Sequence, residues 1–105
     1  MIPEAVAGFD WDDGNLAKCQ RHGVSIAEIE RLLSSDPAVA PDLKHSVEED
    51  RLIAVGRNAA GRPMFVAFTV RMKEGQRLLR AVSARYMHRK EAERYVATSA
   101  KAEKR

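Results

Sequence analysis

The first third of the chain opens with a period-two segment and continues with segments of helical spacing. Residues 6–11 alternate in the manner of a short strand. Residues 13–22 predict a helix that Asp12 or Asp13 can cap, because short acceptor side chains bind the free N–H groups at a helix start. Gly23 follows as the left-handed residue that ends this helix.

A second helix is predicted over about residues 26–34. Ser25 and Glu28 form a capping-box pattern at its start, and the turn residues at 34–37 end it. One side of this helix is apolar, which predicts that it packs against the rest of the protein. The apolar positions are Ile26, Ile29, Leu32 and Leu33.

Strand patterns dominate the middle of the chain. Residues 38–40 predict a short strand that Pro41 confines to a sheet edge, and residues 41–50 predict an exposed loop. Short turns at 58–61 and 73–75 separate three further strands, which predicts antiparallel hairpins rather than β–α–β units. These strands cover residues 51–57, 63–70 and 77–85.

Strict alternation places arginines at the ends of apolar strand faces. Arg51, Ile53, Val55 and Arg57 share one predicted face. The last strand predicts a face made of Arg77, Leu79, Ala81, Ser83 and Arg85. A guanidinium in such a place is suited to a phosphate, since burial there would otherwise require a paired carboxylate.

Helical spacing returns at about His88, with Ala92, Tyr95 and Val96 on the predicted inner side. Residues 98–105 predict a frayed tail. A length of 105 residues fits a single domain over residues 1–105. We therefore expect an α+β fold: a small antiparallel sheet with two N-terminal helices and one C-terminal helix.

Composition excludes several classes of protein. No apolar run approaches the roughly 18 residues of a membrane span, so we expect a cytoplasmic protein without membrane contact. The single cysteine, Cys19, excludes a disulfide framework within the chain and predicts a packed side chain. Neither the glycines nor the histidines have the spacing of a nucleotide or metal site, so we expect no cofactor and no metal.

The formal net charge of +3 conceals a strong asymmetry along the chain. Residues 1–70 hold 7 Lys and Arg against 11 Asp and Glu, a balance of −4. Residues 71–105 hold 11 against 4, a balance of +7. This pattern indicates a polyanion or an acidic protein as partner, or alternatively only a solvated helix and basic tail.

The candidate functional residues are basic side chains that lie close to histidines in the sequence. Lys18, Arg21 and His22 can converge at the end of the first helix, where they would hold a phosphate or only complement the helix dipole. His88 lies at the junction between the last strand and the last helix. The predicted catalytic residues are His22, Arg57, Arg85 and His88, and the predicted RNA-binding residues are Lys18, Arg21, Arg80 and Arg89.

Such a set suits RNA cleavage without a metal. A base assists attack of the 2′-hydroxyl on the adjacent phosphate, cations stabilise the oxyanion, and an acid protonates the leaving oxygen. Spacing alone makes this reaction possible and does not assign the acid and the base.

Several separated motifs resemble the BrnT family of type II toxin–antitoxin systems. They are Phe9-Asp-Trp-Asp12, Arg21-His-Gly-Val-Ser25-Ile, Asp50-Arg-Leu-Ile-Ala-Val-Gly-Arg57, Ser83-Ala-Arg85 and Glu93-Arg-Tyr95. The resemblance extends from residue 9 to about residue 96, with the motifs in order.

The resemblance implies a fold similar to RelE-type microbial ribonucleases and RNA cleavage that halts translation. It also implies neutralisation by a ribbon-helix-helix antitoxin, with operator DNA bound only through that antitoxin. The family-like basic residues are His22, Arg57 and Arg85, and many members have Lys where this chain has Arg21.

Two hypotheses from different classes follow. In the first, the protein is a metal-independent endoribonuclease with His22 in proton transfer, Arg57 and Arg85 on the scissile phosphate, and His88 as a reserve acid or base. In the second, it is a non-catalytic binding module whose basic surface docks a partner protein. The sequence favours the first, because arginines at strand ends are costly choices for docking alone.

Overall fold

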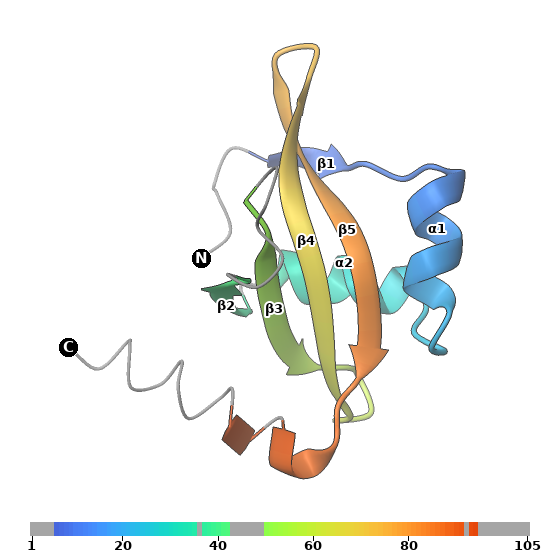
Figure 1. Ribbon diagram of the computed structural model, residues 1–105, viewed down its shortest axis with the longest axis vertical. Coiled ribbons are helices and arrows are strands. Elements are labelled where there is room, and N and C mark those ends of the chain that lie inside the picture. Colours follow the sequence, from blue (N-terminus) through green and yellow to red (C-terminus); the bar gives the residue numbers. More distant parts are fainter. Residues whose placement is uncertain (1–5, 36, 43–49, 92, 95–105) are drawn as a thin grey trace, which may run out of the picture.

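The computed structural model describes residues 6–35, 37–42, 50–91, 93 and 94. Within these residues the chain folds into a five-stranded sheet with helices packed against it (Figure 1). The N-terminal elements are β1 (Val6–Phe9), α1 (Asp13–Gln20) and α2 (Ile26–Ser34). The strands that follow are β2 (Ala38–Pro41), β3 (Leu52–Arg57), β4 (Pro63–Lys73) and β5 (Gln76–Tyr86). Residues 89–91, 93 and 94 are helical.

The strand order is β1-β5-β4-β3-β2. Antiparallel pairing joins β2 to β3, β3 to β4 and β4 to β5, as the short turns predict. However, β1 pairs with β5 in parallel, so the sheet is mixed and the prediction of a purely antiparallel sheet is wrong. Parallel pairing needs a long connection, and the whole of the chain between the two strands provides it.

Both N-terminal helices begin at capping boxes. At α1, the Asp12 side chain accepts from the backbone N–H of Asn15, and the Asn15 side chain accepts from the backbone N–H of Asp12. Ser25 and Glu28 make the same reciprocal pair of hydrogen bonds at α2. The first helix ends at Gln20, two residues earlier than the sequence predicts. Gly23 adopts a φ of 88°, the left-handed conformation expected where the chain turns between the two helices.

The main core lies between the helices and one face of the sheet. In Figure 1, α2 crosses behind the strands while α1 stands beside β5. Cys19 of α1 is fully buried in this core, which confirms that its side chain packs. The buried members of the core are Cys19, Val24, Ile29, Leu32, Leu33, Ala54, Met64, Val66, Phe68, Leu79, Ala81 and Ala84.

A β-bulge changes which side chains share a face of β5. Ala81 pairs with Phe68 but Ser83 pairs with Ala67, so one residue of β5 is extra and the alternation shifts. Leu79 and Ala81 belong to the helix-side core, whereas Arg85 lies over the ring of Phe65. Phe65 packs with the separate cluster of Ile53, Val55 and Met87. The predicted single face from Arg77 to Arg85 is therefore wrong, because a bulge cannot be read from alternation.

The hairpin of β4 and β5 is longer than the sequence predicts and extends past β1 (Figure 1). Its turn places Glu74 at a φ of 51° and Gly75 at 76°, as a tight two-residue hairpin turn requires. Of the positions predicted to face inward in the last helix, Ala92, Tyr95 and Val96 lie outside the described residues, as does the predicted tail at 98–105. No helix among the described residues is long and apolar enough to cross a membrane.

Candidate functional site

Three of the predicted catalytic residues gather at one end of the sheet. Arg57 is the last residue of β3 and pairs with Pro63, the first residue of β4. The backbone N–H of Met87 donates to the Pro63 carbonyl at 3.0 Å, which brings the end of β5 to the same place. Arg85 and His88 lie two residues before and one residue after Met87, so the antiparallel register places the basic ends of β3 and β5 at the same end of the sheet, the cationic end.

Arg85 is held in one orientation by two contacts. Its Nη1 and Nη2 donate to the two carboxylate oxygens of Glu91 at 2.8 and 2.7 Å, a bidentate pair. The guanidinium carbon also lies 4.8 Å from the centroid of the Phe65 ring. The hydrogen bond from Arg85 lowers the pKa of Glu91. Arg85 therefore holds its two terminal nitrogens in an ordered arrangement that binds a carboxylate. A phosphate can accept the same pair of parallel hydrogen bonds.

Glu28 ties the start of α2 to this end of the sheet. Its carboxylate accepts from the Tyr86 hydroxyl at 2.9 Å, from the Asn58 amide at 2.8 Å and from the Ser25 backbone at 3.0 Å. These hydrogen bonds, that of the Ser25 backbone first, lower the pKa of Glu28 to about 2. Arg62 lies over the ring of Tyr86, with its guanidinium carbon 3.7 Å from the ring centroid. The start of α2 and the ends of β3 and β5 are thus fixed to one another by a single ionised carboxylate.

Arg57 borders a pocket between α2 and the β3–β4 turn. The pocket has a volume of about 430 Å³. Arg57 donates through Nη1 to the Gly61 carbonyl at 2.9 Å, which holds its side chain along the turn. The lining residues are Ala27, Glu28, Arg31, Leu32, Ser35, Arg57, Asn58, Ala59 and Ala60.

The basic residues predicted at the end of the first helix form a group that is separate from Arg57. Lys18 is in the last turn of α1, Arg21 caps the helix, and His22 follows in the turn toward α2. All three side chains are exposed. Because α1 packs on β5 rather than on β3, this group is not brought together with Arg57. It adjoins the sheet end only through the short connection from His22 to the Ser25 cap.

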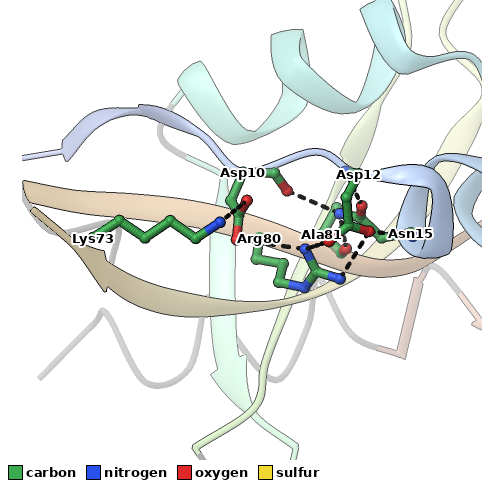
Figure 2. Close-up of polar contacts among 6 residues, drawn as sticks. All are labelled: Asp10, Asp12, Asn15, Lys73, Arg80 and Ala81. Atoms are coloured by element: carbon green, nitrogen blue, oxygen red, sulfur yellow. Dashed lines mark hydrogen bonds and ion pairs between the residues drawn. The ribbon is translucent and has the colours of Figure 1, made fainter.

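Arg80, in the middle of β5, is engaged in an ion-pair network with the segment between β1 and α1. Its guanidinium donates to Asp12 at 2.9 and 3.2 Å and to Asp10 at 3.4 Å, while Lys73 donates to Asp10 at 2.8 Å (Figure 2). The hydrogen bond from Lys73 lowers the pKa of the Asp10 carboxyl, which is 5% exposed. Asn15 completes the junction by donating to the carbonyls of Asp10 and Ala81, both at 2.9 Å. These contacts fasten β1 and α1 to β5.

Arg89, the last of the predicted RNA-binding residues, is exposed at the start of the C-terminal helical segment. It donates to Glu93 at 3.3 Å, an i,i+4 pair in which both side chains are largely exposed. Such a pair is weak and leaves the guanidinium accessible. Arg89 and His88 extend the cationic end of the sheet toward solvent.

Sequence reasoning missed several residues that shape this region. Glu28 is visible in the sequence only as part of a capping box, and Asn58 only as a turn residue. Arg31 and Glu91 occupy polar helical positions that no motif distinguishes. A carboxylate three residues after a cap and an aromatic residue at a strand end are common, so only the tertiary contact of Glu28 with Tyr86 reveals their joint role.

Among the described residues, no three His, Cys, Asp or Glu side chains are grouped so that they could hold a metal ion. What the sheet end does hold is an ordered guanidinium fork, a second arginine beside a pocket, and an exposed histidine. This combination can bind phosphate groups, and an imidazole is a side chain that can donate or accept a proton.

A comparison with known families identifies the class of protein. The sequence model of the family described as "ribonuclease toxin, BrnT, of type II toxin-antitoxin system" matches residues 11–91. The chain belongs to the BrnT family. The match includes Arg57, Arg85 and His88, and it confirms the resemblance seen in the separated motifs. No individual curated protein matches the sequence.

Membership gives the BrnT protein its broad class. The family consists of ribonuclease toxins of type II toxin–antitoxin systems, which supports endoribonuclease activity at the level of the family. RNA as substrate and an antitoxin as partner follow from the same description.

Proposed function

We propose that this protein is a metal-independent endoribonuclease that cleaves RNA by attack of the 2′-hydroxyl and thereby halts translation in the cytoplasm. The observation that carries the proposal is that the register brings the end of β3, with Arg57, and the end of β5, with Arg85 and then His88, to one end of the sheet in a chain of a ribonuclease toxin family. We further propose kinship with the RelE-type ribonuclease fold, which the α+β architecture supports.

In the proposed reaction the 2′-oxygen forms a bond to the adjacent phosphorus while the bond to the 5′-oxygen breaks. The products are a 2′,3′-cyclic phosphate and a 5′-hydroxyl, and the proton lost by the 2′-hydroxyl is balanced by the one gained by the leaving oxygen. Arg57 and Arg85 stabilise the charge on the phosphoryl oxygens. Of the two predicted histidines, His88 lies at this end of the sheet and transfers a proton, whereas His22, the first choice from the sequence, belongs to the separate group after α1.

Glu91 shapes how Arg85 would act in this scheme. The carboxylate holds both terminal nitrogens of Arg85, so an RNA phosphate that binds these nitrogens must replace Glu91. The ring of Phe65 keeps the guanidinium plane in place during this exchange. The surrounding charge therefore keeps Arg85 ordered before substrate arrives.

The deciding experiment uses the purified protein and a short RNA in the presence of excess EDTA. We expect cleavage that leaves a 2′,3′-cyclic phosphate, and no cleavage when a single 2′-deoxynucleotide replaces the residue at the cut. Arg57→Ala and Arg85→Ala are expected to abolish growth arrest on expression while remaining folded. Equal toxicity of these folded variants would reject the assigned site.

The alternative is a non-catalytic module whose basic surface docks a partner protein. This alternative predicts that the purified protein cleaves no RNA under any of these conditions. It also predicts that the same protein binds its partner fully. We also propose that the partner is a ribbon-helix-helix antitoxin and that operator DNA is bound only through it. The test is whether a short reading frame beside the gene encodes a ribbon-helix-helix protein. If it does, the two proteins are co-expressed, and DNA binding by that protein is measured with and without the toxin.

A further inference from the structure

The pocket between α2 and the β3–β4 turn has features of a ligand site. Its volume of about 430 Å³ lies within the range of about 300–1,000 Å³ that is usual for small-molecule sites. It opens beside Arg57, the residue at the end of β3. Neither the family match nor the predicted catalytic set assigns a role to the rest of this pocket.

The lining combines cations with a small apolar wall. Arg31 and Arg57 supply guanidinium groups, whose fork geometry fits phosphate oxygens. Ala27, Ala59 and Ala60 have the smallest apolar side chains, so they leave room and present a surface against which a ribose or base can pack. A ligand with an anionic group and a flat, partly apolar body matches this lining.

The polar groups of the turn are fixed before any ligand binds. The Asn58 side-chain oxygen accepts from the backbone N–H groups of Ala60 and Arg62 at 3.0 and 2.8 Å. The Asn58 amide nitrogen donates to Glu28, and the Gly61 N–H donates to the Asn58 carbonyl at 2.9 Å. A preformed wall of this kind lowers the entropy lost on binding.

Glu28, the carboxylate among the described lining residues, does not oppose an anion strongly. Glu28 already accepts hydrogen bonds from Ser25, Asn58 and Tyr86, so much of its charge is compensated. Arg31 lies one helical turn further along α2, on the same side as Glu28 and Ala27. The balance of charge in the pocket therefore favours a phosphate.

We propose that this pocket binds one nucleotide of the RNA next to the cleaved phosphate. Arg57 contacts the cleaved phosphate, Arg31 contacts the phosphate on the other side of the bound nucleotide, and the alanine wall packs against the sugar and base. The proposal rests on the proposed function, since it places a neighbouring nucleotide beside Arg57. It assigns to Arg31 and Ala60 an effect on substrate affinity and on sequence preference.

Binding is tested on the intact protein with the four nucleoside 3′-monophosphates, followed by NMR of the backbone amides. We expect shifts at Arg31, Ala59 and Ala60, and at least tenfold weaker binding in Arg31→Ala and in Ala60→Trp, which fills the pocket. Ala17→Trp, an exposed alanine on α1, is the matched control and should bind as the unmodified protein does. Absence of shifts at the pocket, or unchanged binding by Ala60→Trp, would overturn the proposal. Equal affinity for inorganic phosphate would overturn its assignment to a nucleotide.

Cleavage assays separate this inference from the proposed function. Ala60→Trp is expected to raise KM at least tenfold and to change the preferred cleavage positions, with a smaller effect on kcat. Unchanged KM and preference would reject the pocket and leave the ribonuclease assignment intact. Nucleotide binding in a protein that cleaves no RNA would support the pocket and reject the ribonuclease assignment.

Discussion

Arg80 and Asp12 meet as two forks, with Nη1 2.9 Å from Oδ2 and Nη2 3.2 Å from Oδ1. The same guanidinium reaches the buried carboxylate of Asp10 at 3.4 Å. Arg80 thus connects the segment between β1 and α1 to the centre of β5. This relationship gives Arg80 a structural role that is separate from its predicted role as an RNA contact.

Removal of this connection should weaken the fold. We expect Arg80→Ala to lower the free energy of unfolding by about 1–3 kcal/mol, because Asp10 loses one of its two cationic partners while remaining buried. Urea unfolding measures the change. Arg77→Ala, at an exposed position on the same strand, is the control and should change stability by no more than about 0.5 kcal/mol. Equal effects of the two variants would contradict the structural role.

The Glu28 cluster predicts a particular dependence of stability on pH. Because the folded protein lowers the pKa of Glu28 from 4.5 to about 2, its ionised form stabilises the fold above the unfolded value. That contribution should decline as the pH falls from about 4.5 through about 2. Glu28→Gln should flatten this part of the curve of unfolding free energy against pH. An unchanged slope in Glu28→Gln would show that other carboxylates dominate the acid transition.

The bidentate contact of Arg85 can be made by an arginine but not by a lysine. We expect Arg85→Ala and Arg85→Lys each to lower RNA cleavage by about 10²–10³-fold, because an ammonium cannot make the bidentate contact. Thermal unfolding of both variants provides the control for folding. Substantial rescue by lysine would mean that charge alone, rather than the fork, acts on the substrate.

Gly56 lies beneath Leu32, and the contact leaves no room for a larger residue. A Cβ atom at position 56 would overlap Leu32 Cδ1, which is part of the main core. We expect Gly56→Ala to lower the free energy of unfolding by about 1–3 kcal/mol through overpacking. Gly8→Ala, where the added carbon meets only an ordinary contact with Leu78, should be much milder. A comparable loss in both variants would point to backbone effects instead.

Local patterns predicted the elements of this fold that depend on neighbours in the sequence. The capping residues Asp12 and Ser25 mark the helix starts, and the short turns mark the hairpins. Pro41 ends the edge strand β2, as its missing N–H requires. Each of these features is determined by a few adjacent residues, which is why it can be predicted from the sequence.

Contacts between distant residues were not predictable in the same way. Nothing in residues 6–9 indicates that they pair in parallel with β5, since that choice depends on the finished sheet. The bulge after Ala81 likewise has no local signature, yet it decides that Arg85 faces Phe65 rather than the helices. The sequence therefore identified Arg57, Arg85 and His88 as candidates, whereas their shared location required the register of the strands.

The parallel pairing of β1 with β5 has a consequence for synthesis of the protein. Phe9 cannot find Leu79, its partner in the sheet, until about 70 further residues have been translated. At 5–20 residues per second this is a delay of about 4–14 s, during which the N-terminal strand has no place in the sheet. The cationic end needs the end of β5 as well, through the bond from Met87 to Pro63. A chain without β5 therefore lacks both of these connections, and the sheet is completed only when β5 has left the ribosome.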